Sequence, residues 1–127
     1  MNFVDAITLL AGCRDMSDEV RQQVDALRLS LHLNLAMCCI KLGDKWQKCA
    51  DNCTEALKID ADNTKALFRR ATAREHLGEL DEALVDAKRA ATLAADDKAI
   101  TRLIARLDAK IERRAAKEKA NLRANVW

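Results

Sequence analysis

The chain has 127 residues, half of them hydrophobic and a third charged, with no proline and few aromatic residues. Its length suits one domain with a modest core, and its richness in alanine, leucine, lysine, arginine and acidic residues is typical of an all-helical protein. It has no apolar run near the roughly 18 residues of a membrane span and no signal-peptide pattern at its N-terminus, so we expect a cytoplasmic protein without a membrane partner.

Helical periodicity and capping residues predict the following elements in chain order. Ser17 is the expected N-cap of a long second helix, Asn63 or Thr64 of the fourth, and Asp96 of the last. The predicted helices span residues of about 3–13, 17–42, 45–59, 64–77, 80–93 and 96 to beyond 114. In the last helix an apolar stripe at helical spacing should cover the end of the molecule: Ile100, Leu103, Ile104, Leu107 and Ile111.

The charges are unevenly distributed along these elements. Residues 1–97 carry 13 lysines and arginines against 17 acidic residues, residues 98–127 carry nine against three, and the net charge is +2. Positive charge confined to one end, without interleaved aromatic residues, argues against a nucleic-acid partner. The five cysteines are an odd number in a chain expected in the cytoplasm, which argues against a disulfide framework.

Two stretches of the chain repeat each other with a period of about 34 residues. Gly43 and Gly78 lie 35 residues apart and Ala56 and Ala90 lie 34 apart, so the first copy has one extra residue in its turn, near Lys45. A helix pair of this period is the tetratricopeptide-repeat pattern, in which each pair stacks on the next. The small residues expected where helices approach closely are Cys49, Ala56, Ala83 and Ala90.

We therefore expect an all-α, right-handed superhelix of antiparallel helix pairs with a long C-terminal capping helix. The whole chain, 1–127, is expected to be a single domain. Its expected divisions are 1–15, the second half of an incomplete first repeat; 17–61, the second repeat; 62–95, the third repeat; and 96–127, the C-terminal helix.

The fourth predicted helix begins with cations, although the N-terminus of a helix already carries partial positive charge and favours anions. The first helix of each pair lines the concave side of such a stack, so Lys65 and Arg69 should face one groove together with Asn34. Two cations, an amide and a helix N-terminus form an anion site. Arg70 lies one residue off this stripe and should be a surface residue or form an intramolecular ion pair. The full stripes are Lys65, Arg69, Thr72 and His76 on one helix and Ser30, Asn34, Met37 and Lys41 on the other.

Four segments carry a resemblance to a known family: LRLSLHLNLAMCCIKLG (27–43), NCTEALKID (52–60), NTKALFRRA (63–71) and KEKANLRANVW (117–127). They look like the tetratricopeptide domains of the large immunophilins, the two-part cyclophilins and FK506-binding proteins that serve as co-chaperones. The resemblance implies capture of the acidic Glu-Glu-Val-Asp C-terminus of heat-shock protein 90, or of the 70 kDa heat-shock chaperone, in a carboxylate clamp.

Three of the five clamp positions of the resembled family fall on residues of this chain, namely Asn34, Lys65 and Arg69. The other two belong to the first helix of the first repeat, which would lie before Met1. We therefore expect an intact parent protein to bind the tail, and residues 1–127 to bind it weakly or not at all. Prolyl isomerisation, if the parent performs it, is expected in a domain outside these residues.

Other side chains allow more than one interpretation. Met37 and Phe68 could contact a methionine or valine of a bound peptide, or could simply pack in the core. The cysteines occupy small inward positions and form no paired CxxC motif, so we expect no zinc and no other cofactor. Nothing indicates a cleft or an orienting group for a Cys–His nucleophile, which makes a non-catalytic binding domain the expected class.

Two alternative partners follow from the ends of the chain. The basic segment 110–127 could bind calmodulin, an association found for the corresponding segment of the resembled family, or could extend into solvent. An uncovered face of helix 3–13 could instead pair two chains into a homodimer, a structural role without peptide binding.

Overall fold

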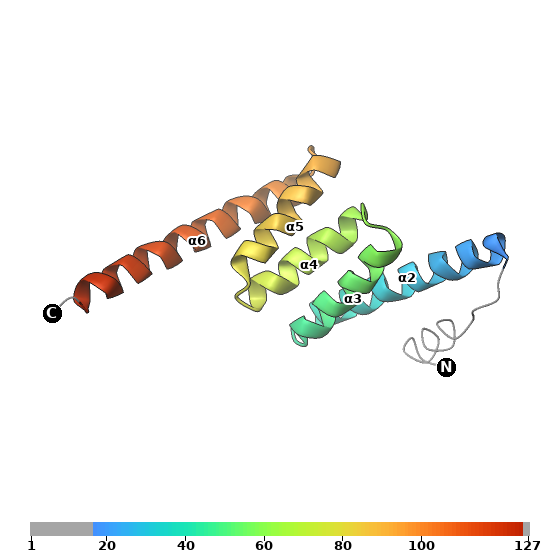
Figure 1. Cartoon of the computed structure of the whole chain (residues 1–127), viewed down its shortest axis with the longest axis horizontal. Helices are drawn as coiled ribbons and strands as arrows, with labels where there is room; N and C mark the ends of the chain where they lie inside the picture. The colour runs from blue at the N-terminus through green and yellow to red at the C-terminus, as the bar shows by residue number, and fades with distance from the viewer. Residues whose placement is uncertain (1–16, 126–127) are drawn as a thin grey trace.

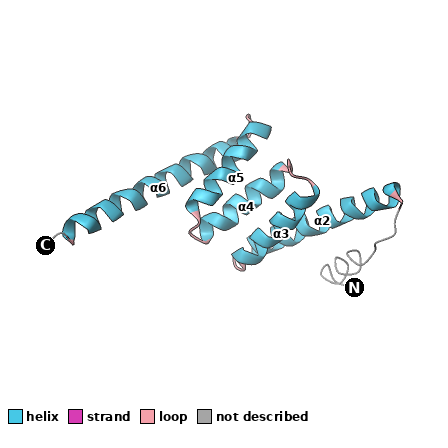
Figure 2. Ribbon diagram, in the orientation of Figure 1, coloured by secondary structure: helices cyan, strands magenta, loops and turns pink. Residues whose placement is uncertain are grey.

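The computed structural model describes residues 17–125 and consists there of five α-helices joined by short turns (Figure 1). Within these residues Figure 2 shows helices and turns and no strand. The helix expected over residues 3–13 lies outside the described residues. The helices are α2 (Asp18–Leu42), α3 (Trp46–Ile59), α4 (Thr64–His76), α5 (Leu80–Leu93) and α6 (Lys98–Ala124).

Local capping explains where three of these helices begin. Ser17 accepts a hydrogen bond from the backbone N–H of Val20, and Asn63 accepts one from Ala66 at 2.9 Å, as the sequence predicts. The N-cap of α6 is Asp97, not the expected Asp96. The turn after α5 closes with a hydrogen bond from the Asp97 N–H to the carbonyl of Ala94, which places Asp97 directly before Lys98, the first residue of the helix.

The turns within the two helix pairs need left-handed backbone. Gly43 has φ of 71° and Gly78 has φ of 80°, a region that residues with a Cβ enter at a cost. Lys45 also has a positive φ, 54°, and lies in the longer of the two turns. The extra residue of the first copy is therefore absorbed by a lysine in left-handed conformation.

Small side chains fill the contacts between the helices. Cys49, Ala56, Ala83 and Ala90 are fully buried, as expected from the repeat. Each lets a neighbouring backbone approach closely, and α4 lies in the middle of the stack, in contact with α2, α3, α5 and α6. The largest fully buried side chains are those of Leu67, Ile100, Leu103 and Leu107.

The terminal helix is docked by its first half only. The predicted stripe packs inward, with Ile100, Leu103 and Leu107 buried and Ile104 and Ile111 half-buried. Beyond this stripe α6 projects away from the other helices (Figure 1), and its later residues are exposed.

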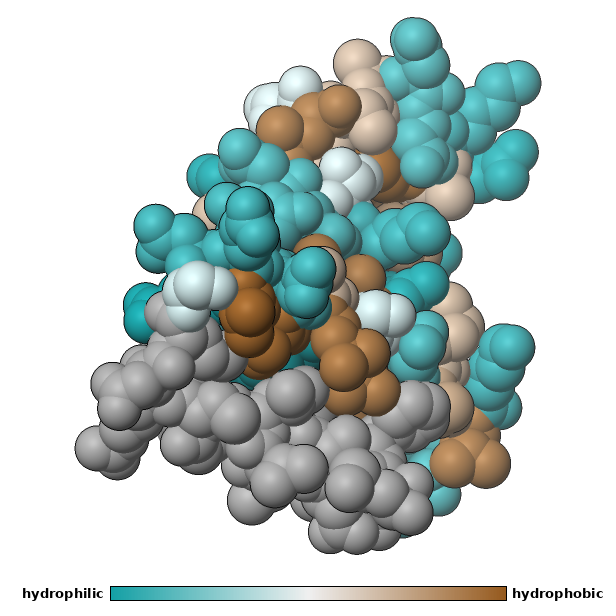
Figure 3. Space-filling view, turned by 90° about the vertical axis from the view of Figure 1, so that its right-hand side faces the viewer, coloured by the Kyte–Doolittle hydropathy of each residue, from teal (hydrophilic) through white to brown (hydrophobic). Residues whose placement is uncertain are grey.

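One face of the molecule is largely polar. On the face shown in Figure 3, hydrophilic residues cover most of the described surface and hydrophobic side chains gather near its middle. Among residues 17–125, no helix combines the length and the hydrophobicity that crossing a membrane requires.

Candidate functional site

A groove with a volume of about 260 Å³ lies between α2, α4 and the start of α6. We refer to it below as the groove. Most of its wall is apolar, and its charged members come from the first turns of α4 and from the N-cap of α6. Its lining residues are Met37, Ile40, Thr64, Lys65, Phe68, Arg69, Thr72, Asp97 and Ile100.

The beginning of α4 holds the two cations of the groove. Asn63 caps the helix, so Lys65 and Arg69 follow one turn apart on the same face. The side chain of Lys65 is exposed, whereas that of Arg69 is half-buried and donates from Nη1 to the carbonyl oxygen of Leu33 at 3.0 Å. This bond ties Arg69, a lining residue of the groove, to α2.

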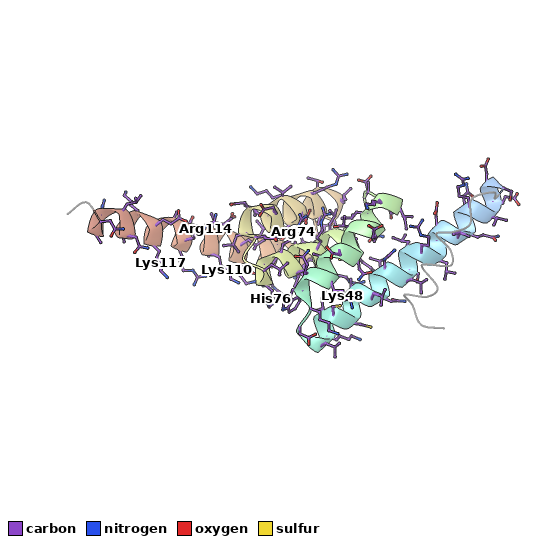
Figure 4. All side chains as sticks on the ribbon, turned by 60° about the horizontal axis from the view of Figure 1, so that its bottom comes forward. Lys48, Arg74, His76, Lys110, Arg114 and Lys117 are labelled. Atoms are coloured by element: carbon purple, nitrogen blue, oxygen red, sulfur yellow. The ribbon has the colours of Figure 1, made fainter. Side chains whose placement is uncertain are left out.

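Neither groove cation forms an ion pair within residues 17–125, in contrast to several cations elsewhere. Figure 4 labels several basic residues outside the groove, along α6 and at the end of α4. Three of them are paired: Arg74 with Asp86 at 2.9 Å, Lys110 with Glu75 at 3.1 Å, and Arg114 with Asp81 at 3.0 Å. The charges of the groove therefore remain available to a ligand.

Arg70, next to the groove cations in sequence, faces the interior instead. Its Nε and Nη2 donate to the two carboxylate oxygens of Asp86, each at 2.8 Å, and Arg74 donates to the same carboxylate. Asp86 is buried, and the hydrogen bond with it raises the pKa of Arg70. Of the two roles predicted for Arg70, a surface residue or an intramolecular ion pair, the structure shows the ion pair.

The groove brings together five of the nine residues that the sequence singles out. Thr72 is one of these, although its hydroxyl donates to the carbonyl of Phe68 at 3.0 Å. The five are Met37, Lys65, Phe68, Arg69 and Thr72.

The other four do not line this cavity. Asn34 is exposed on α2, one residue after the carbonyl that holds Arg69 and one turn before Met37. His76 stacks on Trp46 with ring centroids 3.8 Å apart and planes at 2°, at the end of α4 away from the groove cations. Ser30 and Lys41 are exposed on α2.

Four lining residues are absent from the sequence prediction. Ile40 lies one turn after Met37, so its phase could have indicated it. Thr64 directly precedes Lys65. Ile100 is part of the predicted stripe of the last helix, and Asp97 caps that helix, but the sequence does not say that the start of this helix forms a wall of the groove.

The described residues offer little for catalysis. They contain no group of three or more histidine, cysteine or acidic side chains that could hold a metal ion. The cysteines at positions 38, 39, 49 and 53 are free thiols, and the last three are buried. What the groove provides is two unpaired cations and the carboxylate of Asp97 beside an apolar surface, and the cations are chemically suited to an anionic group.

Comparison with known proteins agrees with this architecture. No protein-family model matches the chain. Over 83 residues it is 41% identical to the peptidyl-prolyl cis-trans isomerase FKBP4 of Bos taurus, a match that covers 65% of this chain and 18% of that protein. The chain thus spans about a fifth of the length of this relative.

Solved structures share the fold. The C-terminal TPR-containing domain of a Plasmodium falciparum FK506-binding protein superposes with a TM-score of 0.81 and 26% identity, over 90% of this chain and 76% of that one. The first TPR of Spaghetti (RPAP3), bound to the HSP90 peptide SRMEEVD, has a TM-score of 0.64 and 26% identity, over 66% of each chain. The second TPR domain of human RPAP3, in complex with the HSP70 peptide SGPTIEEVD, has a TM-score of 0.60 and 31% identity, over 63% of this chain and 66% of that one.

These matches confirm the predicted all-α repeat fold. The chain therefore has the tetratricopeptide-repeat fold, and its sequence and fold are similar to those of the repeat domains of FK506-binding immunophilins.

Proposed function

We propose that the groove captures the acidic C-terminal tail of a heat-shock chaperone of the 90 kDa or 70 kDa class. Lys65 and Arg69 would hold carboxylates of the tail, and Asn34, exposed one turn before Met37, would add an amide donor from α2. The observation that carries the proposal is that both groove cations lack an ion pair within residues 17–125. Two structural neighbours bound to such tails support it.

The energetics favour a short acidic peptide over a single ion. A charge-assisted hydrogen bond contributes roughly 1.5–3 kcal/mol net, so two of them give only modest affinity. The apolar wall formed by Met37, Ile40, Phe68 and Ile100 can add the burial of one aliphatic side chain, worth about 1.5–3 kcal/mol when complete. A tail that carries two carboxylates and an apolar side chain can contact both the cations and the apolar wall of the groove.

The proposed role is that of a co-chaperone adaptor, with binding and no chemistry in these 127 residues. The relative named above is a prolyl isomerase, and the chain matches only a small part of it. We place any isomerase activity of a longer parent outside the groove, because the groove holds no pair of side chains suited to proton transfer or nucleophilic attack.

A heteronuclear NMR titration of the chain with the peptide SRMEEVD tests the proposal, because it measures weak as well as tight binding. Lys65→Ala and Arg69→Ala should each weaken binding by about tenfold or more, the loss expected for one charge-assisted bond. Lys48→Ala is the matched control: it removes an exposed cation of α3 that lies outside the groove lining (Figure 4) and should leave the affinity within about twofold.

One outcome would contradict the proposal, and another would contradict the expectation from the sequence that residues 1–127 bind the tail weakly or not at all. Equal losses for all three variants would mean that binding reflects overall positive charge. A low-micromolar affinity of the unsubstituted chain would show that the three clamp positions found in it, Asn34, Lys65 and Arg69, suffice for binding, against the expectation from the sequence.

A homodimer and calmodulin binding by 110–127 stay predictions. Sedimentation of the free chain distinguishes the first of these from the adaptor role, since a tight dimer that ignores the peptide would favour self-association.

A further inference from the structure

One charge in the groove has the wrong sign for an anion site. Asp97 lines the same cavity as Lys65 and Arg69 and is exposed there, without an ion pair to either cation. Its Oδ1 accepts the N–H of Ala99 at 2.9 Å, which is its role as the N-cap of α6. The hydrogen bond from Ala99 uses only one of its two carboxylate oxygens, so Asp97 keeps acceptor capacity for a further donor.

A carboxylate beside the binding site repels the glutamates of an acidic tail. If the tail also carries a cation close to those glutamates, the carboxylate attracts that cation, and this attraction offsets the repulsion. Asp97 therefore discriminates among acidic peptides by what accompanies their carboxylates.

The two chaperone peptides differ in the residue that lies two places before the first glutamate. In SRMEEVD an arginine lies two residues before the first glutamate, whereas SGPTIEEVD has a threonine there and contains no cation. Side chains at i and i+2 of an extended peptide point to the same face, about 6.5–7 Å apart. One face of the bound strand can thus present the glutamate to Lys65 and the arginine to Asp97, two side chains that line one cavity.

We propose that Asp97 is a specificity-determining residue that pairs with an arginine two residues before the first glutamate of the tail, so that the groove prefers tails of the SRMEEVD type over those of the SGPTIEEVD type. This inference rests on the proposed function, because it concerns the same groove and the same class of ligand.

One substitution removes the charge of Asp97 and keeps its role as the N-cap of α6. Asparagine is as good an N-cap as aspartate, so Asp97→Asn keeps the hydrogen bond to Ala99 and removes only the charge. Asp96→Asn is the matched control, since Asp96 is an exposed carboxylate one residue away that does not line the groove. Both substitutions change the net charge by the same amount.

The experiment is a set of NMR titrations of the unsubstituted chain and the two variants with SRMEEVD, SAMEEVD and SGPTIEEVD. In Asp97→Asn the preference for SRMEEVD over either of the other peptides should fall by about two- to fivefold, the coupling measured for exposed ion pairs. Asp96→Asn should leave that preference unchanged. Using ratios of affinities removes the general gain that any lost negative charge brings to an acidic ligand.

The outcomes separate the two proposals. If the unsubstituted chain binds the peptides and Asp97→Asn leaves the ratios unchanged, or Asp96→Asn lowers them equally, the role of Asp97 is refuted while the proposed function stands. If the unsubstituted chain binds none of the peptides, the proposed function fails and the specificity role fails with it.

Discussion

The guanidinium of Arg69 donates to the carbonyl oxygen of Leu33 across the contact between α4 and α2. One of the two groove cations is therefore a structural link as well as a candidate ligand-binding group. Because the link already restricts its rotamers, Arg69 loses less conformational freedom on binding a carboxylate than the exposed Lys65 does.

The link predicts a stability difference between the two groove cations. Arg69→Met keeps an unbranched stem but removes the donor to Leu33, and it should lower the free energy of unfolding by about 0.5–1.5 kcal/mol. Lys65→Met removes the same charge from an exposed side chain and should change it by less than about 0.5 kcal/mol. Urea unfolding of both variants measures the difference, and equal effects would show that the bond to Leu33 contributes nothing.

The buried carboxylate of Asp86 should be the most sensitive polar position of the stack. It is bonded to Arg70 at 2.8 Å and to Arg74 at 2.9 Å. Asp86→Asn leaves Arg70 without this counter-charge and leaves Arg74 only the more distant Glu79, at 3.9 Å. We expect a loss of about 3 kcal/mol in the free energy of unfolding, the lower end for a broken buried pair, since both arginines are partly exposed.

The control for Asp86 is an exposed pair of similar geometry. Asp81 lies 3.0 Å from Arg114, and Asp81→Asn should cost less than about 1 kcal/mol. If the two substitutions had the same effect in urea unfolding, the burial of Asp86 would be energetically irrelevant.

The ion pairs of Glu75 predict a dependence of stability on pH. Burial raises the pKa of Glu75, but hydrogen bonds from Arg106 and Lys110 lower it more, so the folded value lies below the ordinary 4.5. A lowered carboxylate pKa stabilises the fold fully above the unfolded value, and the contribution is lost as the pH falls through the folded value.

Glu75→Gln isolates this contribution. The gap in unfolding free energy between the unsubstituted chain and Glu75→Gln should be constant near neutral pH and should shrink as the pH falls below 4.5. Urea unfolding at a series of pH values measures it. A gap that widens on acidification would mean that the protonated carboxyl is the favoured form in the fold.

Burial also predicts how the cysteines react. Cys38 is exposed, whereas Cys39, Cys49 and Cys53 are buried. Burial raises the pKa of the Cys39 thiol, and the hydrogen bond with Cys49 together with burial raises that of Cys53, so few thiolates form at these two positions. The hydrogen bond with Cys53 lowers the pKa of Cys49, so this thiol is protected by its burial alone.

In a Cys13→Ser variant, a disulfide reagent should therefore titrate one thiol rapidly under native conditions and the remaining three only in urea. Cys38→Ser in the same background should abolish the fast phase. A persistent fast phase would mean that the core around α3 opens readily.

The sequence predicted what local rules determine. The bounds of α5 were predicted without error, and the ends of α4 to within a residue, because caps and turn glycines are encoded locally. The phase of Lys65 and Arg69 also follows from helical spacing alone. Asp97 and Ile100 could not be assigned to the groove in this way, since the stripe of the last helix shows which side is apolar but not how the helix start lies against α2 and α4.

The position of α6 has a consequence for where this domain can be divided. The start of α6 supplies Asp97 and Ile100 to the groove. The repeats up to residue 95 would therefore lack the wall that these two residues form. A fragment that keeps the complete groove must extend from α2 through α4 and α5 to the start of α6. A segment that covers the end of the stack thus also forms part of the wall of the groove proposed to bind the tail.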